Sequence, residues 1–80
     1  MVRGRPRETS DLVEIARELE RGVSQAEVAR TLDIATSTIQ RRVATMRALL
    51  AEVTGDTIYL REKTTVEVAR DFLRHVDATG

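Results

Sequence analysis

SQAEVARTLDIATSTIQRRV, residues 24–43, decides the fold, because its apolar positions fit two short helices joined by a turn and do not fit one continuous helix. The apolar residues that keep helical spacing on the two sides of the break are Val28, Ala29, Leu32, Ile39 and Val43. Ile34 interrupts that spacing and marks the turn. The segment therefore predicts a helix-turn-helix, in which the first helix holds the second at a steep angle.

Polar residues at both helix starts support this interpretation. Ser24 and Glu27 have the spacing of a capping box, and Thr36 or Ser37 could accept amide hydrogens at the start of the second helix. Upstream, an amphipathic helix is expected from about Ser10 or Asp11 to Arg21, and Gly22 is expected to end it. Three helices then form the predicted core.

The second helix of the motif keeps a polar face whose side chains suit base edges and phosphates. The residues expected to contact DNA in the major groove are Thr36, Ser37, Thr38, Gln40, Arg41, Arg42 and Arg47. Ser24 and Gln25, at the start of the first helix, are expected to contact the DNA backbone.

Composition restricts the class of protein. Eighty residues, 41% hydrophobic and 32% charged, fit one globular domain with a thin core. No apolar run approaches the length of a membrane span, no secretory signal pattern is visible, and there is no cysteine. We therefore expect a cytoplasmic, nucleoid-associated protein that uses no metal or other cofactor, binds no small-molecule ligand and does not contact a membrane.

The net charge is zero, but the positive charges are segregated. Residues 1–7 and 36–47 each contain three arginines and no acid, whereas the segments between and after them are acidic on balance. Residues 1–7 are expected to form a flexible basic arm, because Gly4 and Pro6 prevent a helix there. The arm resembles an AT-hook, and its residues expected to lie in the minor groove are Arg3, Gly4, Arg5, Pro6 and Arg7.

Residues 4–46 resemble the carboxy-terminal DNA-binding domain of bacterial serine recombinases, the DNA invertases and resolvases. The resemblance rests on the sequence GRPR at residues 4–7, ERGV at 20–23, the helix at 26–32, and STI with an arginine at 37–41. It implies that Gly4, Arg5 and Pro6 occupy the minor groove and that Ser37 and Arg41 lie on the recognition helix. Asp33 departs from this family by standing where its turn usually has glycine, and the recombinase catalytic domain is absent.

Residues 51–61 allow two interpretations. In the favoured one they form a β-hairpin wing that turns at Gly55 and Asp56 and pairs Val53 with Ile58. In the other, the third helix continues to Thr54 and Gly55 caps it. The fold class predicted is thus mainly α, with a three-helix core that carries a wing and a carboxy-terminal helix over residues 65–77.

That last helix has an apolar stripe too broad for a three-helix core to cover. Part of it is therefore expected to pack on a second copy of the chain, through Val66, Ala69, Phe72, Leu73 and Val76. An ordinary helix that closes a monomeric core is the alternative.

Together these features predict that residues 8–80 form a sequence-specific domain for double-stranded DNA that acts as a homodimeric transcriptional regulator. The alternatives are a DNA-architectural factor in recombination or plasmid partition, and a protein-interaction module that does not bind DNA. Enzymatic activity is not expected, because His75 is the single histidine and the glycines form no nucleotide-binding pattern.

Overall fold

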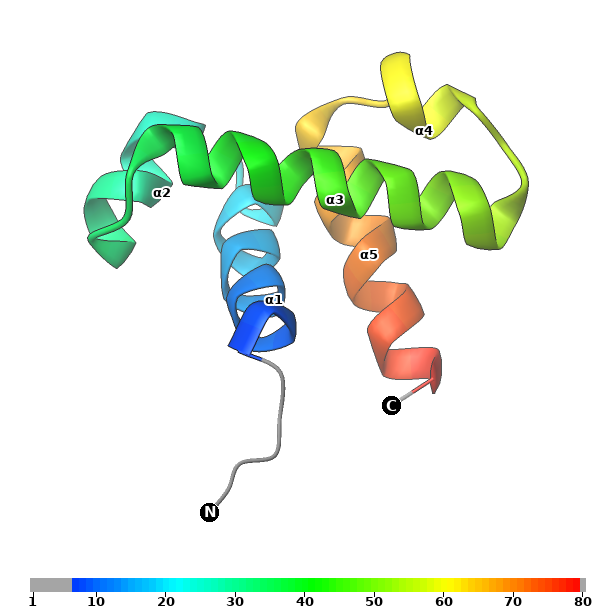
Figure 1. The fold of residues 1–80 in the computed structure, drawn as a ribbon, viewed down its shortest axis with the longest axis horizontal. Helices are drawn as coiled ribbons and strands as arrows, with labels where there is room; N and C mark the ends of the chain where they lie inside the picture. The colour runs from blue at the N-terminus through cyan, green and yellow to red at the C-terminus, as the bar shows by residue number, and fades with distance from the viewer. Residues whose placement is uncertain (1–6, 80) are drawn as a thin grey trace.

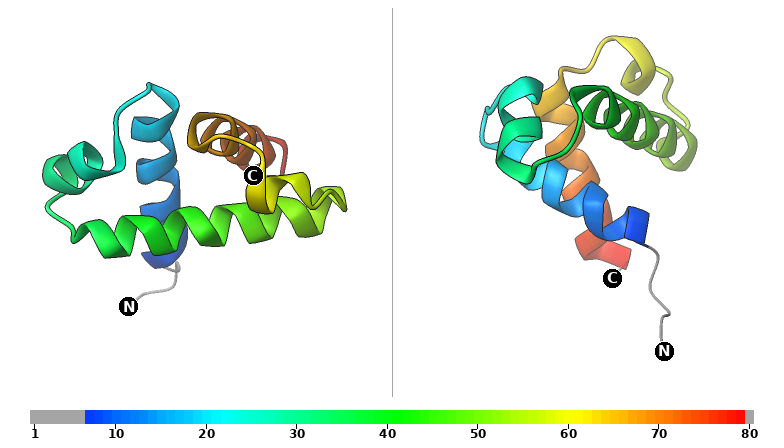
Figure 2. Two further views of the ribbon diagram at one scale, coloured as in Figure 1. Left: turned by 90° about the horizontal axis from the view of Figure 1, so that it is seen from above. Right: turned by 60° about the vertical axis from the view of Figure 1, so that its left-hand side comes forward.

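The computed structural model describes the backbone of residues 7–79 and the side chains of residues 12–78, and within that part of the chain all regular structure is helical. The helices are α1 (Arg7–Glu20), α2 (Gln25–Leu32), α3 (Thr36–Thr54), α4 (Ile58–Arg61) and α5 (Thr65–Thr79). Helix α3 lies across α1 and α5, while α2 packs at its start and α4 along its second half (Figures 1 and 2). The mainly helical class and the helix-turn-helix are confirmed.

The turns around α2 follow from local backbone chemistry. Gly22 ends α1 with φ of 88° and donates its N–H to the carbonyl of Leu19 at 2.9 Å. Asp33 ends α2 in the left-handed conformation, with φ of 58° and ψ of 49°. Aspartate tolerates that conformation better than most residues, so the turn forms at the position where the resemblance implied glycine.

Four helices share one apolar core. The buried residues are Ile15, Ala16 and Leu19 of α1, Val28 and Ala29 of α2, Ile39, Val43, Met46 and Leu50 of α3, and Val68, Ala69 and Phe72 of α5. Helices α1 and α5 contact each other most extensively and run in opposite directions beneath α3 (Figure 1). The core therefore fixes α3 from one side and leaves its opposite side exposed.

The predicted wing over residues 51–61 is wrong, and the alternative helix to Thr54 is what forms. Met46 and Leu50 continue the buried stripe of α3, and Gly55, with φ of 73°, donates its N–H to the carbonyl of Ala51 at 2.9 Å. Asp56 Oδ1 then accepts the N–H of Ile58 at 3.1 Å, which starts the short helix α4. A carboxylate that caps this turn favours helix over strand for residues 58–61.

Two of the predicted helix boundaries also differ from the observed ones. Helix α1 begins at Arg7, three residues before the expected start at Ser10. The N-cap of α3 is Ala35, which makes no side-chain hydrogen bond, so the expected caps Thr36 and Ser37 are not used. Helix α5 agrees with the expected 65–77 to within two residues.

The predicted dimer residues have two different environments in α5. Ala69 and Phe72 are buried in the core of their own chain, with 0% and 3% of their surfaces exposed. Val66 is exposed, and Leu73 and Val76 are half-buried. Only the last three could therefore meet another molecule. No helix in the described part of the chain is both long and apolar enough to cross a membrane.

Candidate nucleic-acid interface

The turn between α2 and α3 determines how α3 is presented. Ala29 is 5% exposed on α2, and its small side chain allows α3 to approach closely. The N–H of Ile34 donates to the carbonyl of Ala29 at 2.9 Å, and the N–H of Asp33 donates to that of Arg30 at 3.3 Å. These bonds give partners to two of the carbonyls that the end of α2 leaves without an acceptor role inside the helix.

The outer side of α3 carries most of the residues predicted to contact bases. Thr36, Ser37, Gln40 and Arg41 are exposed, and they lie opposite the buried stripe of the same helix. The side chains of Ser37, Gln40 and Arg41 make no hydrogen bond or ion pair to any other residue that the structure describes. A hydroxyl, an amide and a guanidinium are thus available to a ligand on one turn of one helix.

Thr38 and Arg42 are placed differently from these residues. Both are half-buried, and Arg42 lies two residues beyond Gln40, about 200° around the helix. The structure therefore separates Arg42 from the exposed face, although the sequence grouped the two residues together.

Arg47 is engaged within the chain. Its Nη1 donates to the carbonyl oxygens of Tyr59 at 3.0 Å and Lys63 at 2.8 Å, which ties the second half of α3 to α4 and the segment after it. The side chain is half-buried in this position. Arg47 is therefore held away from the face formed by Ser37 and Arg41.

Helix α2 adds little net charge to this surface. Its N-cap Ser24 is exposed and accepts the N–H of Glu27 at 3.2 Å, while Gln25 is half-buried. The Glu27 carboxylate pairs with Arg30 at 2.9 Å. Because that pair is neutral, the positive charge on the face formed by α2 and the first half of α3 comes mainly from Arg41.

The predicted arm falls largely outside the described residues, which begin after Arg3, Gly4, Arg5 and Pro6. Arg7 is the first residue of α1. Its position in a helix shortens the segment available as an arm to residues 1–6.

Sequence reasoning missed the polar cluster that positions α4. The Tyr59 hydroxyl donates to Asp71 Oδ2 at 2.8 Å, and Lys63 Nζ lies 5.5 Å from the centre of the Tyr59 ring. This hydrogen bond to a carboxylate, followed by burial, raises the pKa of Tyr59 above its usual value. The partners are twelve residues apart, so no local pattern could have identified them.

The described residues show no arrangement suited to a metal ion, since no three His, Cys, Asp or Glu side chains among them converge. The geometry thus concentrates the exposed, unengaged polar chemistry of the helix-turn-helix on the first half of α3.

Comparison with known proteins gives one match. The family model described as the CENP-B N-terminal DNA-binding domain matches residues 10–53, which span most of α1, all of α2 and nearly all of α3. No curated protein and no solved structure matches the chain. The family match supports the prediction of a helix-turn-helix DNA-binding domain and does not confirm the resemblance to serine recombinases.

Proposed function

The chain belongs to the family of the CENP-B N-terminal DNA-binding domain, and from this membership we propose that it binds double-stranded DNA in a sequence-specific manner. The observation that carries the proposal is the exposed first half of α3, where Ser37, Gln40 and Arg41 have no other partner in the described structure. We propose that the chain acts as a transcriptional regulator in the cytoplasm.

In this proposal α3 enters the major groove, which is wide enough to admit a helix. Arg41 would form a bidentate contact to the O6 and N7 atoms of a guanine, and Gln40 would contact an adenine. The hydroxyls of Ser24 and Thr36, at the starts of α2 and α3, would donate to phosphates on the two sides of the major groove. Because Arg30 already pairs with Glu27, α2 would contribute no free guanidinium to base contacts, and base recognition would come from α3.

Residues 1–6 would follow the adjacent minor groove. Arg3 and Arg5 suit the strong negative potential of A·T-rich sequence, and Gly4 permits a close approach. Because no acid occurs in this segment, it would also add to the salt dependence of binding.

The replacement Arg41→Ala tests base reading by α3. Selection from random duplexes at physiological salt should first yield a preferred site for the wild-type chain. The variant should lose about 1–3 kcal/mol of discrimination at one base pair of that site, because a bidentate contact contributes about that much. Arg30→Ala is the matched control, because Arg30 is an exposed arginine that already pairs with Glu27. Equal weakening on every sequence after Arg41→Ala would contradict a role in base reading.

Deletion of residues 1–6 tests the arm separately. The truncated chain should keep the preference contributed by α3 but lose its preference for an A·T-rich flank, with a shallower salt dependence. The measurement is the same selection, followed by titrations at several salt concentrations. An unchanged site profile and salt slope would remove the minor-groove assignment.

A further inference from the structure

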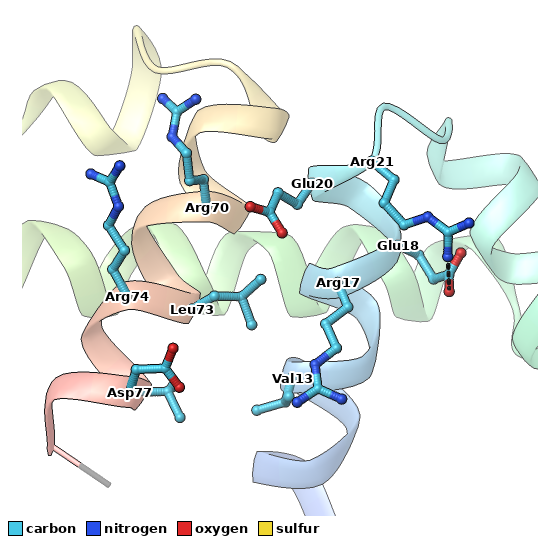
Figure 3. A pocket seen from close by; sticks show the side chains of 10 residues that line it. Val13, Arg17, Glu18, Glu20, Arg21, Arg70, Leu73, Arg74 and Asp77 are labelled. Atoms are coloured by element: carbon cyan, nitrogen blue, oxygen red, sulfur yellow. Dashed lines mark ion pairs between the residues drawn. The ribbon is translucent and has the colours of Figure 1, made fainter.

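A groove runs between α1 and α5 on the side of these helices that faces away from α3 (Figure 3). It encloses about 630 Å³. Val13 of α1 and Leu73 of α5 point toward each other across it (Figure 3), and Val76 is a third apolar residue of its lining, so these three form its apolar floor. All three side chains are half-buried, so the core of the single chain leaves part of this floor uncovered.

The charges around the groove are nearly balanced, since four arginines and three acids line it. Arg21 pairs with Glu18 at 3.6 Å, and both Arg70 and Arg74 approach Asp71 at 3.9 Å. Arg17, Glu20 and Asp77 have no ion-pair partner among the described side chains. A rim of mixed sign is a poor match for a polyanion such as DNA, but it is a good match for a surface with the same mixture.

We propose that this groove is the interface of a two-fold symmetric homodimer, in which α1 of one copy packs on α5 of the other. Helices α1 and α5 run in opposite directions, and Arg17 and Asp77 lie toward the same end of the groove (Figure 3). A two-fold axis parallel to the groove would therefore place Arg17 of each copy beside Asp77 of the other. The same operation stacks the two apolar floors.

This interface leaves the proposed DNA-binding face uncovered, because α3 lies on the other side of α1 and α5. The two-fold operation places the two copies of α3 on opposite outer sides of the dimer, so each copy stays accessible to its own segment of DNA. The dimer does not depend on the proposed DNA contacts, so it can be tested without DNA.

The test is sedimentation equilibrium of the full chain without DNA, together with charge-exchange variants. The wild-type chain should be dimeric at tens of micromolar. Arg17→Asp and Asp77→Arg should each weaken the dimer about tenfold, because each creates two like-charge contacts across the axis. The double variant should recover most of the loss, since it restores opposite charges with their positions exchanged.

Arg61→Asp provides a matched control, because Arg61 is an exposed arginine on α4 that lies outside the groove. Circular dichroism of every variant should match the wild type, since Arg17 and Asp77 are exposed. A wild-type chain that stays monomeric at tens of micromolar would overturn the proposal. A dimer that tolerates both single variants as well as it tolerates the control would also overturn it. Neither result would bear on whether the monomer binds DNA.

Discussion

The two halves of α3 each carry an arginine, and the two arginines are in opposite situations. In the first half, Arg41 is exposed and its side chain makes no hydrogen bond or ion pair to a described residue, whereas Arg47, less than two turns later, donates to two backbone carbonyls. Both arginines come from one acid-free block of sequence. The difference lies in what packs nearby, because α4 covers the second half of α3 and nothing described covers the outer side of the first. An arginine can bind DNA only where the fold leaves its donors unused.

The two capping sequences show the same contrast. At the start of α5, the N–H of Thr64 donates to Glu67 Oε1 at 3.0 Å and the N–H of Glu67 donates to Thr64 Oγ1 at 3.2 Å. At the start of α2, Ser24 accepts the N–H of Glu27, but the Glu27 carboxylate turns to Arg30. The capping box is thus complete at α5, whereas the one predicted at α2 is half-formed. Glu67 has Arg70 at the same spacing and still closes its box, so an arginine three residues on does not by itself decide where the glutamate turns.

The largest effect that separates the two halves of α3 is expected from Arg47→Ala. Loss of the two hydrogen bonds to Tyr59 and Lys63 should lower the free energy of unfolding by about 1–2 kcal/mol, because the donor is charged and half-buried. In a domain of this size that corresponds to about 4–8 °C in Tm for each kcal/mol. Thermal unfolding followed by circular dichroism measures it.

Arg41→Ala is the counterpart on the exposed half of the helix. It should leave Tm unchanged within error while it removes base discrimination, whereas Arg47→Ala should keep the preferred site and the salt slope of the folded protein. If Arg47→Ala left Tm unchanged and reduced the salt slope, Arg47 would be a phosphate contact and the contrast between the two halves of α3 would fail.

The helix-turn-helix could be predicted from sequence because its signals are local. The spacing of Val28 and Leu32, then of Ile39 and Val43, placed two helices correctly, and Gly22 marked the end of α1. Gly55 was ambiguous, because glycine adopts the positive φ that both a hairpin turn and a helix C-cap require. The buried stripe through Met46 and Leu50 decided in favour of the helix, and that stripe was visible in the sequence.

The remaining features depend on contacts between residues far apart in the chain. No pattern indicated that Arg47 would reach the carbonyl of Lys63, or that Tyr59 would donate to Asp71. The same limit applied to the apolar stripe of α5, whose width was read as a dimer surface. Ala69 and Phe72 are instead covered by the other helices of the same chain.

The smallest expected effect distinguishes the two capping glutamates. The hydrogen bond from the N–H of Thr64 lowers the pKa of Glu67 below its ordinary value of 4.5, because it favours the charged carboxylate. Because the pKa of Glu67 is lower in the folded state, its stabilising effect is fully present at a pH above about 4.5, the pKa of the unfolded chain. The effect is lost as the pH falls through the pKa of the folded state. The replacement Glu67→Gln should therefore flatten the decline of Tm between neutral and acidic pH.

Glu27→Gln is the control that sharpens this last comparison, because Glu27 follows its cap residue at the same spacing but pairs with Arg30 in place of the backbone. Both residues are in the first turn of their helices, so both replacements remove the same charge from the same kind of position. A measurement of Tm against pH should then show a larger change in slope for Glu67→Gln, since an exposed ion pair contributes little to stability. If the two replacements changed the slope of Tm against pH equally, the helix dipole would act on both carboxylates alike, and the closed capping box at α5 would have no effect of its own.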